Sequence, residues 1–230
     1  MSLRRRLVLA ASIAFMLLPV RAVYAAEDLK SVLAKLDTAA ANFRSTSADF
    51  EFDSIQTDPV PDTEVQKGTV YYARQGNSFQ MAAHIVQDNG KPVPKIYTFS
   101  SGVFRLYEKL INQVTTYKNE KLGSYLMLGF GASGKDLADK WNITYAGTET
   151  INGVKTERLE LIAKDPAVRK NLVKVTVWMD ITHGVSLKQV FDEGQGLSRV
   201  STYSNFKFNQ ALPGDAFKIP TDSKTQYVNR

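Results

Sequence analysis

Short segments with alternating side chains, separated by turn-forming residues, fill most of this chain and restrict its fold more than any other feature. In the first of them, Phe50 and Phe52 alternate with acidic residues. Turn residues such as Asn89-Gly90 lie between successive segments, and pairs of this kind favour tight hairpins. Ten further strand-like segments span residues 65–74, 78–87, 95–100, 103–108, 113–118, 142–149, 155–164, 173–181, 185–192 and 197–209.

Strands that follow one another without intervening helices form antiparallel neighbours rather than βαβ units. About eleven strands are too many for a flat sheet in one small domain, so we expect the sheet to curl into a full or partial barrel. The sequence therefore predicts a mainly β protein with a few helices, of the α+β class.

Residues 28–43 depart from the two-residue alternation. Apolar side chains, among them Leu29, Val32 and Leu36, recur there at the spacing of one helical face, with charged residues on the other side. This pattern predicts one amphipathic helix at the start of the domain.

Residues 122–141 interrupt the strands a second time. Ser133 followed by Asp136 is typical of a helix N-terminus. The residues before Ser133 are apolar side chains divided by several glycines. Because glycine lowers helix stability, we expect this insert to be short, kinked and movable.

Several strands carry apolar or aromatic side chains on both faces; Val70, Tyr71 and Tyr72, for example, are consecutive. A strand with one face in water normally keeps its apolar side chains on the other face alone. Two interpretations stay open here. Either both faces are core, or helices cover one face and a ligand or core fills the other.

The first 25 residues have the three parts of a cleavable secretory signal. Residues 4–6 are arginines, residues 7–20 form an apolar run, and Ala25 supplies a small residue before the cut. The run is shorter than the ~20 residues that a membrane-spanning helix needs. We therefore expect cleavage after Ala25, export, and one mature domain over residues 26–230.

The signal also accounts for most of the positive charge. The whole chain has 29 Lys and Arg against 23 Asp and Glu, a net charge of +6. Four arginines leave with the signal, so the mature chain has 25 basic residues against 23 acidic ones, a net charge of +2. With no clustered basic stripe, we expect no nucleic-acid partner.

The chemistry-bearing residues are few. The chain has no cysteine, which excludes disulfides, thiol chemistry and a lipid-modified N-terminal cysteine. His84 lies in a strand-like segment and His183 in a turn, and no catalytic or phosphate-binding motif accompanies them. We therefore expect a binding protein rather than an enzyme, with no metal and no cofactor.

Four stretches of the chain occur in a recognisable order: the helix around residues 29–36, the strand at 67–74, the run at 98–107 and the closing segment at 213–220. In order and spacing, over roughly residues 28–220, they resemble the LolA-type outer-membrane lipoprotein carriers and the wider superfamily of that fold. The resemblance implies an incomplete antiparallel β-barrel, with its concave face covered by the N-terminal helix and by a helical lid insert.

The resemblance also implies a function. A hydrophobic cavity under the lid would hold the acyl chains of a lipoprotein or lipid, and the carrier would shuttle this cargo through the periplasm. Its partners would be an inner-membrane transporter and an outer-membrane receptor, and the carrier itself would be a monomer. A second function stays open: a non-enzymatic sensor or regulatory module of the same fold that binds a membrane or periplasmic protein.

One residue matches a family position with a defined role. Arg74 stands where the second strand of the family ends in a basic residue, which donates hydrogen bonds to backbone carbonyls of the lid and holds the cavity closed. A guanidinium with five donors suits this lid latch. Gln75 replaces the proline that usually follows, so we expect a differently shaped hairpin. The alternative for Arg74 is an ordinary surface arginine.

The resemblance and the two-residue parity of the strands together select residues that would line the cavity. Each of them is also consistent with plain core. They are Val70, Tyr72, Phe79, Met81, Phe99, Phe104 and Leu106 from the strands, and Tyr125, Met127, Leu128 and Phe130 from the lid.

Overall fold

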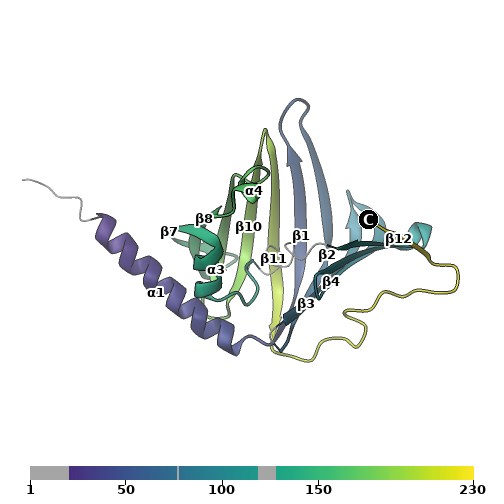
Figure 1. The fold of residues 1–230 in the computed structure, drawn as a ribbon, viewed down its shortest axis with the longest axis horizontal. Helices are drawn as coiled ribbons and strands as arrows, with labels where there is room; N and C mark the ends of the chain where they lie inside the picture. The colour runs from purple at the N-terminus through teal and green to yellow at the C-terminus, as the bar shows by residue number, and fades with distance from the viewer. Residues whose placement is uncertain (1–20, 77, 119–127) are drawn as a thin grey trace, which may run out of the picture.

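The fold is given by a computed structural model, which describes residues 21–76, 78–118 and 128–230. Twelve strands in these residues form one sheet (Figure 1). The strands are β1 (Ser45–Gln56), β2 (Asp62–Gln75), β3 (Ser78–Asp88), β4 (Lys91–Ser100), β5 (Val103–Glu108), β6 (Gln113–Lys118), β7 (Trp141–Ile151), β8 (Val154–Ala163), β9 (Lys174–Asp180), β10 (Val185–Gly194), β11 (Leu197–Phe208) and β12 (Gln226–Asn229). The helices are α1 (Arg21–Asn42), α3 (Gly134–Lys140) and α4 (Pro166–Arg169), with a 3-10 turn at Lys109–Ile111.

The sheet is open. Its order is β12-β6-β5-β4-β3-β2-β1-β11-β10-β9-β8-β7, so β12 and β7 are the two edges and do not pair with each other. Neighbours are antiparallel except β12, which runs parallel to β6. The predicted incomplete antiparallel barrel is therefore confirmed, and each of the eleven predicted strands is present. β12 has no counterpart among them, because four residues are too few to display an alternating pattern.

One long-range pairing joins the two halves of the chain. β1 pairs with β11 over residues far apart in the sequence, and the register places Phe50 opposite Tyr203. The same strand β1 pairs with β2 on its other side. The middle of the sheet is therefore built from the first strand and the last long strand.

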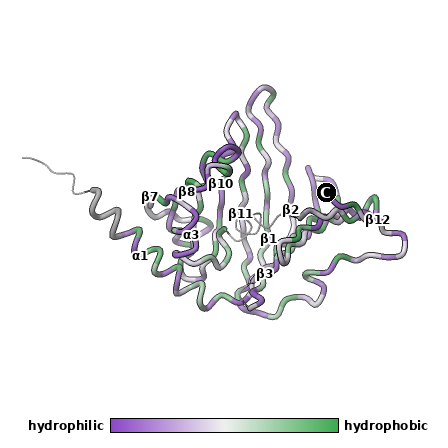
Figure 2. The backbone as a smooth tube through the Cα atoms, in the orientation of Figure 1, coloured by the Kyte–Doolittle hydropathy of each residue, from purple (hydrophilic) through white to green (hydrophobic). Residues whose placement is uncertain are grey.

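α1 begins at Arg21, ahead of the predicted start at residue 28. The added residues contain several alanines and neither glycine nor proline, so they continue a helix readily. Figure 2 shows hydrophobic and hydrophilic residues interspersed along α1. Of the helices in the described residues, none combines the length and the hydropathy needed to cross a membrane.

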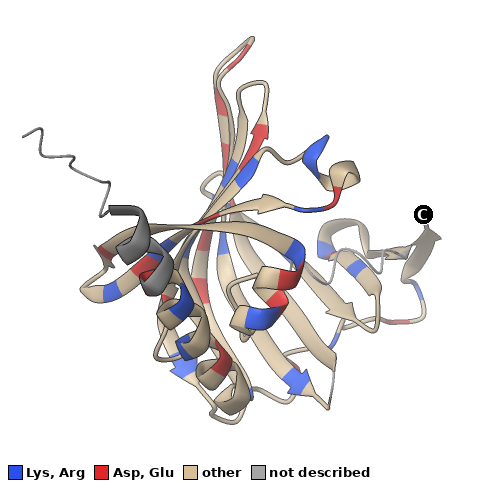
Figure 3. Ribbon diagram, turned by 60° about the vertical axis from the view of Figure 1, so that its left-hand side comes forward, with Lys and Arg blue, Asp and Glu red and all other residues tan. Residues whose placement is uncertain are grey.

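α1 and α3 pack against the same face of the sheet, which we call the inner face. Val32 and Leu36 of α1 and Leu137 of α3 join a buried cluster with Leu159 and Val177 of the strands β8 and β9. Figure 3 shows both helices lying in front of this part of the curled sheet. This cluster is the core of the β7–β10 half.

A second buried cluster lies on the inner face beside the first. Phe43, just after α1, packs there with Val70 and Tyr72 of β2, Met81 of β3 and Tyr203 of β11. α1 and α3 contribute residues to the first cluster and none to the second, and it is beside the second that the structure has a hollow.

α3 forms where the sequence predicts it. Ser133 caps the helix by accepting a hydrogen bond from the Asp136 backbone N–H, and the Asp136 side chain bonds back to the Ser133 N–H. The first residue of this helix, Gly134, needs to be glycine because a Cβ there would lie 2.2 Å from the Leu33 carbonyl oxygen of α1. The absence of this side chain lets the two helices approach closely.

The outer face is partly covered by the chain itself. Residues 209–225 connect β11 to β12 and place the buried Ala216 against β3. There the Ala216 carbonyl lies 2.9 Å from His84 Nε2, so the ring nitrogen is the donor. Apolar residues therefore occur on both faces of these strands because the inner face packs in the buried clusters and the outer face is partly covered by residues 209–225.

Candidate ligand-binding hollow

The second cluster surrounds a hollow on the inner face with a volume of about 510 Å³. Pockets that hold small ligands have volumes of about 300–1,000 Å³. Its walls come from β1, β2, β3, β10 and β11, with Tyr97 and Phe104 from β4 and β5 and with Leu172 from the turn before β9. Most of its lining is apolar, as a site for an acyl chain requires.

Phe130 belongs to the cluster around the hollow and is fully buried. Its ring stacks on Tyr72, with ring centroids 4.0 Å apart and planes within 8°. It also meets Tyr203 edge-on at 4.9 Å between centroids. Tyr72 and Tyr203 line the hollow, and Phe130 packs against both of these rings. We call this end of the hollow the deep end.

The two tyrosines at the deep end stay uncharged. Burial raises the pKa of Tyr72 well above its ordinary value. Burial likewise raises the pKa of Tyr203 to about 12. An ionised phenol is therefore absent from the deep end at any pH at which such a protein works, and the surface there is neutral and mostly aromatic.

Phe130 reaches this position because residues 128–131 pair with the start of β10. The Ser186 N–H donates to the Gly129 carbonyl at 2.7 Å, and the Gly131 N–H donates to the Gly184 carbonyl at 2.9 Å. The buried side chain of Gln189 donates to the Leu128 carbonyl at 2.7 Å. We call residues 128–131 the plug segment.

The glycines of the plug segment have a structural role beyond lowering helix stability. Gly129 and Gly131 have φ of +82° and +68°, which favours glycine. A Cβ on Gly129 would lie 2.4 Å from the Gln189 amide nitrogen, and one on Gly131 would lie 2.5 Å from the Phe43 ring. The plug segment is therefore packed tightly at its glycines.

Arg74 connects three parts of the structure beside the deep end. Its Nε donates to the Phe43 carbonyl at 3.2 Å. One terminal nitrogen donates to the Ala40 carbonyl at 3.3 Å and to the Gly131 carbonyl at 3.1 Å. Although the residue is exposed as a whole, its guanidinium joins the end of α1, the end of β2 and the plug segment. Of these three carbonyls, that of Gly131 lies in the insert at residues 122–141, and the role of Arg74 as a lid latch stays a prediction.

An aromatic row continues the inner face beyond the hollow, over β3 to β6. Phe79 stacks on Phe99 at 5.4 Å, and Tyr97 stacks on Phe104 at 5.5 Å. Phe104 also meets Tyr117 at 6.1 Å. Rings in such offset or tilted contacts give an apolar surface that packs well against hydrocarbon.

The structure separates the predicted cavity residues into groups. Val70, Tyr72, Met81 and Phe104 line the hollow, while Phe79 and Phe99 belong to the same cluster beside it. Phe130 belongs there too, from a non-helical segment. The remaining residues lie elsewhere: Leu106 faces inward opposite Tyr97 without lining the hollow, Leu128 is buried in the cluster under α1, and Tyr125 and Met127 lie outside the described residues.

The prediction omitted several residues that do line the hollow. Phe50 and Phe52 have the required alternation, but local pattern does not reveal which strands neighbour β1. Phe191 and Tyr203 reach the hollow only because β10 and β11 pair next to β1. These residues could have been identified only from the order of the strands in the sheet, and local sequence spacing does not contain that order.

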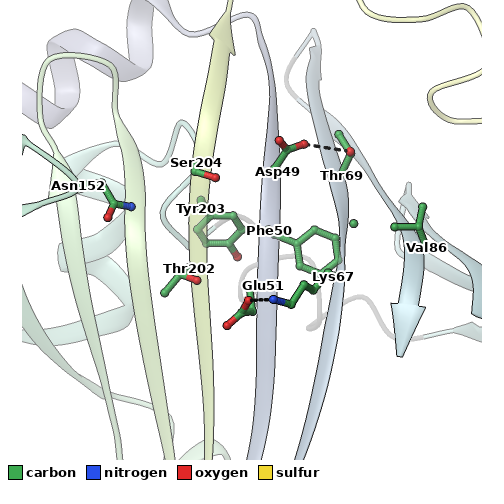
Figure 4. Close-up of a pocket in the computed structure, with 11 residues that line it drawn as sticks. Asp49, Phe50, Glu51, Lys67, Thr69, Val86, Asn152, Thr202, Tyr203 and Ser204 are labelled. Carbon is green, nitrogen blue, oxygen red and sulfur yellow. Dashed lines mark hydrogen bonds and ion pairs between the residues drawn. The ribbon is translucent and has the colours of Figure 1, made fainter. Parts of the chain in front are cut away.

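A second hollow, of about 440 Å³, lies over β11, β1 and β2 (Figure 4). Glu51 and Lys67 form an ion pair there. Asp49 accepts hydrogen bonds from the Thr69 hydroxyl at 3.3 Å and from the Asn205 amide at 2.8 Å. Because charged and polar groups make up most of this lining, it does not suit an acyl chain, and the apolar hollow is the better candidate.

Neither histidine lies in the apolar hollow. His183 Nδ1 is 2.6 Å from Asp180 Oδ2, and its ring stacks on Phe208 at 4.0 Å. His84 holds the C-terminal segment. Within the described ranges, no group of three or more His, Asp or Glu side chains is arranged to hold a metal ion.

Figure 3 shows basic and acidic residues of the described part interspersed along the helices and strands rather than gathered by sign.

Comparison with known proteins adds one relative in sequence. No protein-family model matches the chain. An uncharacterized protein of Methanocaldococcus jannaschii is 30% identical over 117 residues, which make up 50% of this chain and 32% of that protein. The chain thus spans about a third of the length of this curated relative.

The solved structures give the fold. The chain is similar to an uncharacterized conserved protein from Thermus thermophilus, with a TM-score of 0.56 and 12% identity, over 88% of this chain and 99% of that one. It is similar to MucB, with a TM-score of 0.53 and 13% identity, over 88% of this chain and 66% of MucB. A LolA superfamily protein from Nitrosomonas europaea matches with a TM-score of 0.40 and 15% identity, over 83% of this chain and 97% of that one. At these identities the likeness concerns the fold alone, and it is the fold of the Thermus thermophilus protein and of MucB that the chain shares.

Proposed function

We propose that the protein is a non-enzymatic carrier that holds the acyl chain of a lipid or lipoprotein in the apolar hollow. The observation that carries this proposal is the hollow itself, about 510 Å³ in volume and lined at its deep end by Tyr72 and Tyr203, on which the buried Phe130 packs. Burial of an acyl chain contributes about 0.8 kcal/mol per CH₂. Burial of several CH₂ groups in this hollow therefore supplies a favourable free energy of binding.

The same proposal places the carrier in the periplasm as a monomer, after removal of the signal at Ala25. Its sequence supports export, and its fold supports a carrier. Cargo would pass from an inner-membrane transporter to an outer-membrane receptor. A regulatory module that binds a protein partner is the second candidate, favoured by the likeness in fold to MucB, a protein solved in a complex with MucA.

The test is displacement of a fluorescent fatty acid by palmitate, with Ala83→Phe as the variant. Ala83 lines the hollow, so a phenyl ring there fills space that the ligand needs. Exclusion of two CH₂ groups already weakens binding about tenfold, and we expect at least that loss. The matched control is Val86→Phe, because Val86 is on the same strand and 62% exposed.

The outcomes separate the candidates. Saturable binding by the wild type and by Val86→Phe, with loss in Ala83→Phe, supports the carrier. Absence of saturable binding in the wild type contradicts it and favours the regulatory module, which a pull-down of a membrane protein in lipid-free buffer would then support. Melting temperatures of all three proteins show that the variants are folded.

A further inference from the structure

The hollow changes from apolar to polar along the strands that line it. On β11, Tyr203 is at the deep end, Ser201 follows, and Arg199 lies two residues further along. At about 3.3 Å per residue, Arg199 is roughly 13 Å from Tyr203 along the strand. On the neighbouring strand β10, the amide of the lining residue Gln189 is already bonded to the Leu128 carbonyl. Phe191 follows and pairs with Arg199, and the charged Glu193 lies beyond it.

β2 shows the same gradient on the other side of β1. Tyr72 and Val70 are buried, and Gln66 is the lining residue furthest from them on this strand. Gln66 and Ser201 both lie opposite Phe52 in the register of β1. The polar ends of β2, β10 and β11 therefore meet at one end of the hollow, which we call the open end, away from the Phe130 plug.

An ion pair forms part of the open end. Arg199 Nε is 3.0 Å from Glu193 Oε1, with the side chains 52% and 25% exposed. Among the described residues that line the hollow, these two are the charged ones. Hydroxyl and amide groups such as Ser201 and Gln66 lie near them, beside the rings of Phe52 and Phe191. The open end therefore has no net charge, yet offers both hydrogen-bond donors and acceptors.

This arrangement discriminates between head groups. A polar group that leaves water must find hydrogen-bond partners, and the open end supplies both kinds. A head group with a net negative charge would be attracted by Arg199 and repelled by Glu193. A head group with a net positive charge would be attracted by Glu193 and repelled by Arg199. A head group in which opposite charges or dipoles are paired matches both side chains at once.

We infer that the ligand is an amphiphile whose head group carries no net charge and both donates and accepts hydrogen bonds. Its tail points toward Tyr72 and Tyr203, and its head lies beside Glu193 and Arg199. This inference rests on the proposed carrier function and adds to it the orientation and the head-group class of the ligand.

The experiment compares two lysophospholipids with the same acyl chain: zwitterionic lysophosphatidylethanolamine and anionic lysophosphatidylglycerol. Affinities are measured by displacement of the fluorescent fatty acid. For the wild type we expect the zwitterionic lipid to bind more tightly, by roughly two- to fivefold, the effect of one partly exposed charge interaction. Palmitoyl-glycinamide, an uncharged amide, serves as a third probe. Whichever of the two neutral probes binds more tightly identifies a phospholipid or an acylated protein as the source of the head group.

Two variants change the charge of the open end in opposite directions. Glu193→Gln leaves Arg199 uncompensated and should move the preference toward the anionic lipid by a similar factor. Arg199→Gln leaves Glu193 uncompensated and should weaken the anionic lipid further. Glu51→Gln and Lys67→Gln are matched controls, because they break an ion pair outside this hollow with the same changes in net charge, and they should leave the ratio of affinities unchanged.

The inference and the function on which it rests fail in different ways. If both lipids bind the wild type equally and neither variant moves the ratio, the head-group inference is wrong while the carrier function stands. Equal shifts in the Glu51 and Lys67 controls also contradict it, since the effect would then come from overall charge. If no lipid displaces the fatty acid, or the fatty acid itself fails to bind, both are wrong.

Discussion

Replacing Phe130 by alanine is expected to lower the free energy of unfolding by about 3–5 kcal/mol, the usual cost of removing a buried phenylalanine ring. Phe130 is fully buried and in ring contact with Tyr72 and Tyr203. These contacts join the plug segment to both β2 and β11, so the loss affects both halves of the sheet. Urea unfolding followed by circular dichroism measures the change.

The control is Leu110→Ala. Leu110 is 73% exposed, and an exposed substitution of this kind changes stability by less than about 0.5 kcal/mol. A loss below about 1 kcal/mol for Phe130→Ala would show that the ring is not packed as described. The deep end of the hollow would then need another explanation.

Replacing Arg74 by leucine is expected to change stability and ligand affinity in opposite directions. The guanidinium makes three hydrogen bonds, to the carbonyls of Ala40 in α1, of Phe43 just after α1 and of Gly131 in the plug segment. Its partial exposure limits the loss of stability to about 1–2 kcal/mol. The proposed latch role places these bonds in the closed, empty protein. Their removal therefore favours the ligand-bound state, and affinity for palmitate should rise about tenfold.

Arg74→Lys separates charge from geometry. Lysine keeps the positive charge but lacks the planar set of donors that reaches three carbonyls, so we expect an intermediate gain in affinity. The measurement pairs urea unfolding with displacement of the fluorescent fatty acid for both variants. A loss of stability with unchanged or weaker binding in Arg74→Leu would contradict the latch and leave Arg74 a purely structural residue.

Local patterns predicted the elements of this fold well. Alternation identified the strands β1 to β11, and Ser133 with Asp136 identified the start of α3, because both signals arise within a few residues. The face of β2 that bears Val70 and Tyr72 also follows from alternation alone. Alternation does not reveal that this face is the inner one; that prediction came from the family resemblance.

The rest of the hollow depends on contacts that no local pattern contains. Phe50 and Tyr203 share the hollow because β1 pairs with β11, strands separated by most of the domain. The plug segment is defined by its pairing with β10. Its glycines are explained by the side chains they approach, Gln189 and Phe43, which the sequence places far away.

The central claim is that an acyl chain lies in the hollow lined by Tyr72, Met81 and Tyr203, and photo-crosslinking of a diazirine-bearing palmitate tests it most directly. The account predicts saturable labelling of peptides from β2, β3 and β11, competed by unlabelled palmitate and reduced in Ala83→Phe. An exposed apolar surface elsewhere supplies the comparison: Leu110, Ile111 and Tyr227 are 73%, 57% and 65% exposed. Labelling at these three residues, or labelling that does not saturate, would contradict the account.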